Sequence, residues 1–214
     1  MRLARLQDFS NRENGCMGSS KVIEYIDIAA PREEVFGLVV DLKRRMQLSP
    51  LWGFAAFENL SPEYPEPGSS YQVRPKDGEV AGYTTIITEY QPLAKLAYRL
   101  TAETQTNVTW SVQSVAQGTR IIYEEEFLIG EDQDQEAFKE SVKKIVSQWL
   151  KNIKNYSELR EGRIKRAVRW FLDRYFLKLR TDQRNVIITI LFMQAVGIIS
   201  FIMAAIALGI ARTF

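Results

Sequence analysis

An uninterrupted apolar stretch near the C-terminus constrains this sequence more than any other feature. Residues 186–210 are 25 consecutive positions without a formal charge, with Arg184 before them and Arg212 after them. A helix of that length is roughly 37 Å long, and about 30 Å is enough to cross the hydrocarbon core of a bilayer. The alternative is a helix buried in a protein core, but such helices rarely lack every charge over this length. The stretch therefore predicts a membrane-spanning helix over residues 185–211, followed by a short tail, residues 212–214.

Basic residues cluster directly before this apolar stretch. The whole chain carries a formal net charge of +2, but residues 160–184 alone carry +6 and residues 1–159 carry −5. Because Lys and Arg are enriched on the cytoplasmic flanks of membrane spans, we expect the N-terminal body on the cytoplasmic side, which equally describes the stromal side of an internal membrane. The predicted arrangement is a single-pass, tail-anchored protein whose span inserts after synthesis ends.

The basic segment, residues 160–184, has the pattern of an amphipathic helix. At about 100° per residue, its apolar side chains share one arc and most of its charges lie opposite, which is typical of helices in the lipid headgroup layer. A solvated helix that continues from the preceding domain is the alternative. Nucleic-acid binding would compete with the adjacent bilayer, so no nucleic-acid partner is expected. The side chains expected to face the membrane surface are Arg163, Arg166, Arg169, Lys178 and Arg180.

Small residues recur in the apolar stretch at steps of three and four. Such a stripe lets a second helix approach closely, and one polar side chain lies near its edge. The stripe predicts packing against a second copy of this chain or against another membrane protein. The alternative is a plain anchor, because small residues are common in membrane helices. The residues expected to pack are Gln194, Gly197, Ser200 and Ala204.

The N-terminal body has the pattern of a soluble α+β domain. A strand that ends at Pro31 is followed by a helix, then by several antiparallel strands, and then by a long helix after Gly130. This order predicts a curved antiparallel sheet wrapped around the long C-terminal helix, over residues 21–159. We expect residues 1–20 to form a flexible arm.

Five segments of this body resemble the START-like superfamily, also called SRPBCC. They are, in chain order, IDIAAPREEVFGLVVDL, SPLW, PGSSYQV, ITEYQPLAKLAYR and VTWSVQSVAQGTRIIYEEEF. The superfamily includes polyketide cyclase/dehydrase-like proteins, coenzyme Q-binding proteins and the birch-pollen allergen. The resemblance covers residues 21–159 and implies a helix-grip fold that encloses an apolar cavity. Members of the superfamily typically bind lipids, sterols, quinones or polyketides in that cavity. For a domain held beside a bilayer we expect no required cofactor and a lipid, quinone, isoprenoid or pigment as the ligand.

Strand and helix periodicity selects the side chains expected to line that cavity. A filled core without a usable hole is the alternative. The expected lining residues are Ile26, Ile28, Tyr71, Val73, Trp110, Tyr123, Phe127, Val142, Ile145 and Trp149. Glu24 and Glu125 share inward faces, where an unpaired carboxylate is costly, and Arg74 and Arg99 are their candidate partners in anchoring a polar ligand head. In the alternative, these glutamates lie at the surface or form a structural pair, because a one-residue bulge would turn either one to solvent.

The sequence offers little support for catalysis. It contains no histidine and a single cysteine, Cys16, and it lacks a phosphate-binding glycine loop, a nucleophile elbow and metal-ligand spacing. We therefore predict no catalytic residue and no metal site. We expect a domain that binds a hydrophobic small molecule beside the bilayer, with membrane lipid as a partner. Two alternatives stay open: an accessory subunit of a larger membrane complex, and an enzyme that acts on a lipid-like substrate.

Overall fold

The computed structural model describes residues 18–51, 55–75, 82–101, 105–129, 135–159, 163–175, 177, 179 and 181–211. Within these ranges seven antiparallel strands form one sheet, in the order β1-β7-β6-β5-β4-β3-β2. The strands are β1 (Gly18–Ile28), β2 (Ala55–Glu58), β3 (Ser70–Pro75), β4 (Tyr83–Gln91), β5 (Lys95–Thr101), β6 (Gln105–Val115) and β7 (Gly118–Ile129). The helices are α1 (Arg32–Val40), α2 (Leu42–Leu48), α3 (Gln135–Ser157), α4 (Arg163–Arg174) and α5 (Thr181–Ala211).

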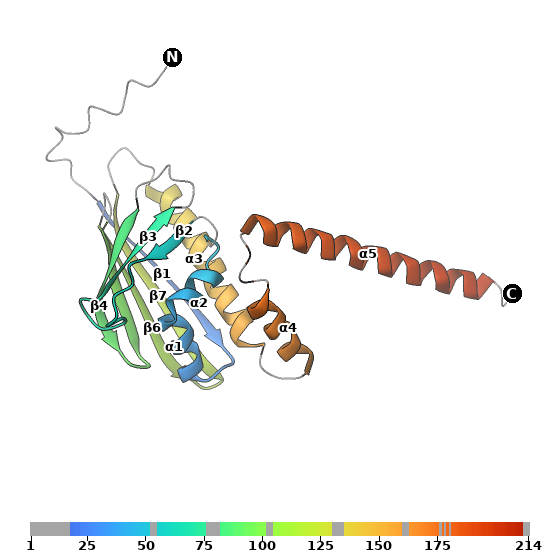
Figure 1. Cartoon of the computed structure of the whole chain (residues 1–214), viewed down its shortest axis with the longest axis horizontal. Helices are drawn as coiled ribbons and strands as arrows, with labels where there is room; N and C mark the ends of the chain where they lie inside the picture. Colours follow the sequence, from blue (N-terminus) through green and yellow to red (C-terminus); the bar gives the residue numbers. More distant parts are fainter. Residues whose placement is uncertain are drawn as a thin grey trace, which may run out of the picture.

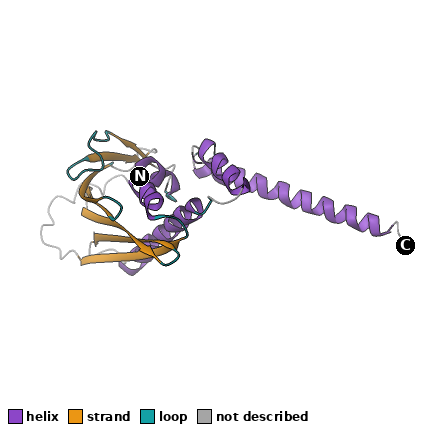
Figure 2. Cartoon of the chain, turned by 90° about the horizontal axis from the view of Figure 1, so that it is seen from below, coloured by secondary structure: helices purple, strands orange, loops and turns teal. Residues whose placement is uncertain are grey.

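The sheet bends around α3, and α1 and α2 lie on the same concave side (Figures 1 and 2). The α+β helix-grip architecture expected from the sequence is therefore confirmed. On β1, Val22 and Ile28 are buried, whereas the intervening Ile23 and Tyr25 are 53% and 64% exposed. This alternation shows that only one face of the sheet contributes to the core.

The turn between β6 and β7 requires glycine. Gly118 has a φ of 136°, and a Cβ at this position would lie 2.2 Å from the carbonyl oxygen of Ile28. Only glycine adopts this backbone conformation freely and leaves room for the end of β1. The pairing of β1 with β7 over its whole length, from Gly18 to Ile28, depends on this close approach.

The helix that the sequence predicts after Pro31 is broken into two. α1 ends at Val40, and Asp41 has an extended backbone conformation with ψ 94°. The Asp41 carboxylate accepts a hydrogen bond of 2.9 Å from the backbone N–H of Arg44 and so caps α2. Apolar periodicity alone did not reveal this break, because a capping Asp competes locally with helix continuation.

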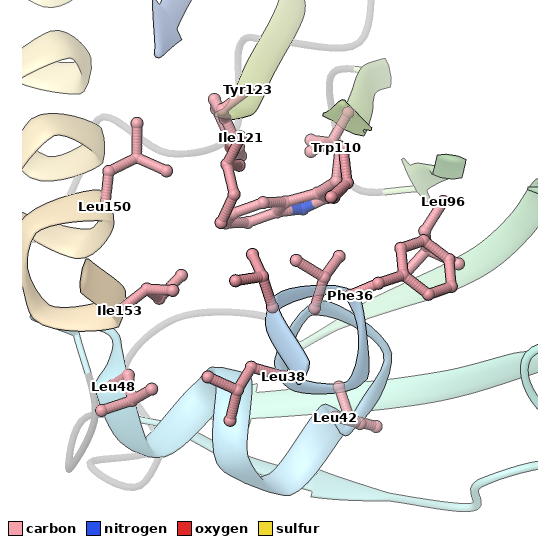
Figure 3. Packing of buried hydrophobic residues seen from close by; sticks show 14 of the residues in the cluster. Phe36, Leu38, Leu42, Leu48, Leu96, Trp110, Ile121, Tyr123, Leu150 and Ile153 are labelled. Carbon is pink, nitrogen blue, oxygen red and sulfur yellow. The ribbon is translucent and has the colours of Figure 1, made fainter. Parts of the chain in front are cut away.

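The two short helices fill part of the concave side with apolar side chains (Figure 3). Figure 3 shows residues of α1 and α2 facing residues of the sheet and of α3 across a closely packed core. The side chains labelled there are Phe36, Leu38, Leu42, Leu48, Leu96, Trp110, Ile121, Tyr123, Leu150 and Ile153.

The basic helix α4 is docked on the domain. Asp173 of α4 forms an ion pair with Arg44 of α2, and it accepts a hydrogen bond of 2.8 Å from the hydroxyl of Tyr156 on α3. Leu177, just after α4, is buried in the core. The end of α4 and Leu177 just after it are therefore held against the domain by both charged and apolar contacts.

α5 extends away from the domain (Figure 1). Its segment Val186–Met203 has a mean hydropathy of 2.5 and none of it is buried, so it is long and apolar enough to cross a membrane. β1 begins at Gly18, which is inside the arm predicted for residues 1–20. The rest of that arm and the predicted tail, residues 212–214, lie outside the described residues.

Candidate functional site

A cavity of about 190 Å³ lies on the concave side of the sheet, between the strands, α2 and α3. Aromatic and aliphatic side chains make up most of its wall, and one cation and one carboxylate interrupt them. The cavity reaches the surface at Leu51, which follows α2 and is half-exposed. The full set of lining residues is Arg45, Met46, Leu51, Tyr71, Val73, Tyr83, Thr85, Tyr98, Leu100, Tyr123, Glu125, Val142, Ile145, Val146 and Trp149.

Six of the ten apolar residues expected to line a cavity do line this one: Tyr71, Val73, Tyr123, Val142, Ile145 and Trp149. The other four do not, and their placement is a correction. Ile28 and Trp110 are packed core residues, and Ile26 packs against that core. Phe127 packs beside Val22 in a separate small cluster. Strand alternation identifies the inward face, but it does not show which part of that face the helices fill.

Trp110 nevertheless supports the cavity wall from behind. Its ring meets those of Tyr123 and Trp149 edge to face, with centroids 4.8 and 5.0 Å apart. The indole N–H of Trp149 donates a hydrogen bond of 3.0 Å to the backbone carbonyl of Arg45. These contacts fix the position of α2 relative to α3 along one side of the cavity.

Arg45 is the cation of the cavity, and the sequence analysis missed it. Its side chain is 1% exposed, and it donates hydrogen bonds from Nη1 to the Val39 carbonyl at 2.7 Å and from Nη2 to the Tyr71 hydroxyl at 3.2 Å. The sequence nevertheless indicates that Arg45 is buried. It lies three residues from both Leu42 and Leu48 on a helix and therefore shares their face.

Glu125 is the carboxylate of the cavity. Its Oε2 accepts a hydrogen bond of 2.7 Å from the hydroxyl of Tyr123, two residues earlier on the same strand. Burial raises the pKa of Glu125, and the hydrogen bond from Tyr123 offsets part of this effect. Burial also raises the pKa of Tyr83 to about 12, so that at neutral pH its hydroxyl is uncharged and able to donate.

The other three predicted polar anchors do not reach the cavity. Glu24 faces α3, where its carboxylate accepts a hydrogen bond of 3.1 Å from Ser147 Oγ. Arg74 is exposed and pairs with Glu58 at 3.4 Å. Arg99 is also exposed, and its Nε donates a hydrogen bond of 3.3 Å to Asn107 Oδ1 on the neighbouring strand β6.

The predicted pairing of Arg74 and Arg99 with the inward glutamates is therefore wrong. Each arginine directly follows an inward residue, Val73 and Tyr98 respectively, and therefore points to the opposite face of the sheet. The alternation of side chains along a strand is therefore sufficient to predict that both arginines point away from the cavity.

The basic side chains expected at the membrane surface do not share one environment. Arg166 is exposed. Arg169 is directed to the domain: its Nη1 lies 2.9 Å from Glu34 Oε1, and its guanidinium lies over the ring of Tyr156. The structure thus corrects the expected lipid-facing position of Arg169. The side chains of Arg163, Lys178 and Arg180 lie outside the described residues.

The small-residue stripe of α5 is open. Gln194, Gly197 and Ser200 are exposed, and a Cβ on Gly197 would meet nothing within 4 Å. The side chain of Ala204 lies outside the described residues. In the part of the chain that is described, no group of three or more His, Cys, Asp or Glu residues could hold a metal ion.

Comparison with known proteins gives a family match and a fold match. The family described as polyketide cyclase / dehydrase and lipid transport matches residues 20–158, which leaves α4 and α5 outside the matched region. No curated protein matches the sequence.

Solved structures with the same fold include proteins of several kinds. A protein from Mesorhizobium loti is 13% identical with a TM-score of 0.53, and the match covers 67% of this chain and all of that one. A protein of unknown function from Staphylococcus aureus is 10% identical with a TM-score of 0.52, covering 68% and 99%. The di-domain ARO/CYC protein StfQ of the steffimycin biosynthetic pathway is 12% identical with a TM-score of 0.53, covering 66% and 51%. At these identities the likeness shows the fold alone.

Proposed function

Because the chain belongs to the polyketide cyclase/dehydrase and lipid transport family, we propose that its helix-grip domain binds a hydrophobic small molecule in the cavity beside α3. The observation that carries this proposal is the cavity itself, a mostly apolar hollow of about 190 Å³ whose wall contains the side chains of Arg45 and Glu125 and several hydroxyl groups. Ligand sites typically combine apolar walls with a few polar groups that orient the ligand.

The size of the cavity restricts how a ligand enters. Ligand sites usually span roughly 300–1,000 Å³, so an extended molecule needs the wall to move. Met46 and Leu51 are suited to such movement, because Leu51 is half-exposed and the unbranched Met46 side chain adapts to irregular space. A lipid, quinone, isoprenoid or pigment would enter past these two side chains.

The proposal extends to the membrane. α5 serves as a single-pass anchor that keeps the domain on the cytoplasmic or stromal side. Support comes from the segment Val186–Met203, none of which is buried, so that its apolar side chains would be unfavourable in water. The +6 charge of residues 160–184 supports the sidedness.

α4 supports a location close to the bilayer surface. Trp170 and Tyr175 are 61% and 52% exposed and contact each other edge to face at 5.8 Å. Aromatic side chains of this kind favour the headgroup layer. Since apolar ligands concentrate in lipid, a domain held beside the bilayer meets its ligand at a higher local concentration.

A blocked cavity tests the binding function. We would purify the full chain with a mild detergent from its native membranes and identify the bound small molecules by mass spectrometry. Val142→Trp places a large ring in the cavity, and Lys144→Trp adds the same ring on the exposed side of α3. A stoichiometric apolar molecule is expected with the wild type and Lys144→Trp and not with Val142→Trp. Equal recovery from all three, or none from the wild type, would contradict the proposal.

A second candidate function is an accessory subunit of a larger membrane complex. The open stripe around Gly197 favours it, because a small residue in a membrane helix allows close packing with another helix. Gly197→Leu would then abolish the recovery of a fixed set of membrane proteins, or of a second copy of this chain. If the wild type runs as a lone monomer from native membranes, this second function fails.

A further inference from the structure

Arg45 carries an unsatisfied charge at the edge of the cavity. Among the side chains that the structure describes as buried, it is the one with a formal charge. The Val39 carbonyl and the Tyr71 hydroxyl accept its hydrogen bonds, the Tyr64 hydroxyl also interacts with it, and all three groups are neutral, while its Nε–H has no partner within the described residues. A buried cation is costly unless an anion compensates it, and no carboxylate among the described residues forms an ion pair with Arg45.

The carboxylate that shares the cavity does not supply this missing anion. Glu125 accepts its hydrogen bond from Tyr123, and no ion pair joins it to Arg45. Because burial raises the pKa of Glu125, its carboxyl group gains a proton more readily than an exposed one and repels an incoming anion less. The positive end of the cavity therefore remains available to a negatively charged group from outside the chain.

A purely structural role explains only part of these contacts. The bond to Val39 satisfies a carbonyl at the end of α1, and the guanidinium also lies 5.2 Å from the centre of the Tyr98 ring. The first contact uses an N–H donor of the guanidinium and the second places the guanidinium over an aromatic ring. Neither contact neutralises the positive charge. The longer bond to Tyr71, at 3.2 Å, is the one that a stronger acceptor would most easily replace.

We propose that Arg45 binds the carboxylate of an apolar acid whose hydrocarbon body lies along the wall formed by Val142 and Trp149. This rests on the proposed binding function of the cavity and specifies its ligand class. A guanidinium matches a carboxylate because two parallel N–H groups can donate to its two oxygens. A phosphate ester fits less well, since it brings more charge into a small cavity that already contains Glu125.

The test compares two probes that differ in the head group. The full chain, in nanodiscs of neutral phosphatidylcholine, is titrated with decanoic acid labelled with ¹³C at the carboxyl carbon, and separately with decanol. Carbon NMR distinguishes protein-bound from lipid-bound acid, and displacement of the acid measures the binding of decanol. We expect decanoate to bind about tenfold more tightly than decanol to the wild type, since charge-assisted hydrogen bonds are roughly twice as strong as neutral ones.

Two variants test whether Arg45 causes the preference for decanoate over decanol. Arg45→Met should abolish it, whereas Lys43→Met, which removes an exposed cation from the same helix, should leave it unchanged. A second readout separates binding from folding: next to a guanidinium, the bound carboxylate of the wild type stays ionised at pH values where lipid-borne decanoic acid is protonated. This measurement does not depend on whether Arg45→Met folds.

The outcomes distinguish the two proposals. Equal affinity of the wild type for decanoate and decanol would overturn the role of Arg45 and leave the hydrophobic binding function in place. Saturable binding of neither probe would overturn both. A preference for decanoate that survives in folded Arg45→Met would also reject Arg45 as its source.

Discussion

The two parts of the sheet's concave side differ in how they are occupied. In the filled part, α1 and α2 pack against Trp110, Leu150 and Ile153, each no more than 1% exposed (Figure 3). In the hollow part, the cavity of about 190 Å³ lies between β3 to β5, β7, α2 and the middle of α3, with Arg45 and Glu125 in its wall. The comparison indicates that stability comes mainly from one part and binding from the other.

The largest expected effect is on the filled part. Ile153 is fully buried between α3 and the sheet, so Ile153→Ala removes contacts and leaves a void. We expect it to lower the free energy of unfolding by about 2–5 kcal/mol. Urea unfolding of the full chain in mild detergent, followed by tryptophan fluorescence, measures this loss. An effect below about 1 kcal/mol would mean that the filled part does not dominate stability.

An intermediate effect is expected at the junction between α1 and α2. Asp41→Ala removes the cap on α2 and should destabilise the fold by about 0.5–2 kcal/mol. Asp41→Asn retains an acceptor for the Arg44 N–H and serves as the control. If alanine and asparagine have equal effects in the same urea experiment, the hydrogen bond does not contribute. Because α2 carries Arg45, Asp41→Ala should also weaken the preference for decanoate.

The hollow part should tolerate truncation. Val142 is partly buried and already borders the cavity, so Val142→Ala should cost less than about 1 kcal/mol, because it creates no new cavity. The same change widens the binding site and should improve the recovery of larger ligands by mass spectrometry. A loss of stability as large as that of Ile153→Ala would show that the two parts are not energetically distinct.

The difference between the filled and the hollow part also separates what the sequence could predict from what it could not. Alternation along β1, β3 and β7 and the stripe of α3 were enough for the architecture and for six cavity residues, since these depend on local periodicity. The exclusion of Ile28 and Trp110 from the cavity depends on where α1 and α2 lie, which is a tertiary property. Arg45 was missed because the lining residues were selected by apolar periodicity, which does not select a charged side chain. Its spacing of three residues from both Leu42 and Leu48 was the available indication that it shares their buried face.

The smallest expected effect concerns the pH dependence of stability, through Glu125. Its pKa is raised in the folded state, mainly by burial, above the ordinary value of 4.5. Between the ordinary value and the raised one, the unfolded chain has released this proton while the folded chain still holds it. The contribution of Glu125 to stability is therefore fully present below pH 4.5 and is lost as the pH rises through the folded pKa.

Replacing Glu125 by glutamine, its neutral isostere, tests the direction of this pH dependence. Glu125→Gln should remove the loss of stability that accompanies deprotonation of Glu125. The unfolding free energy of this variant should therefore fall less than that of the wild type as the pH rises from 4 to 8. Glu126→Gln, on the exposed face of the same strand, should follow the wild-type slope. Urea unfolding at several pH values provides the comparison. If Glu125→Gln has the same slope as the wild type, burial of Glu125 does not hold its proton, and the hollow part is more hydrated than its apolar wall suggests.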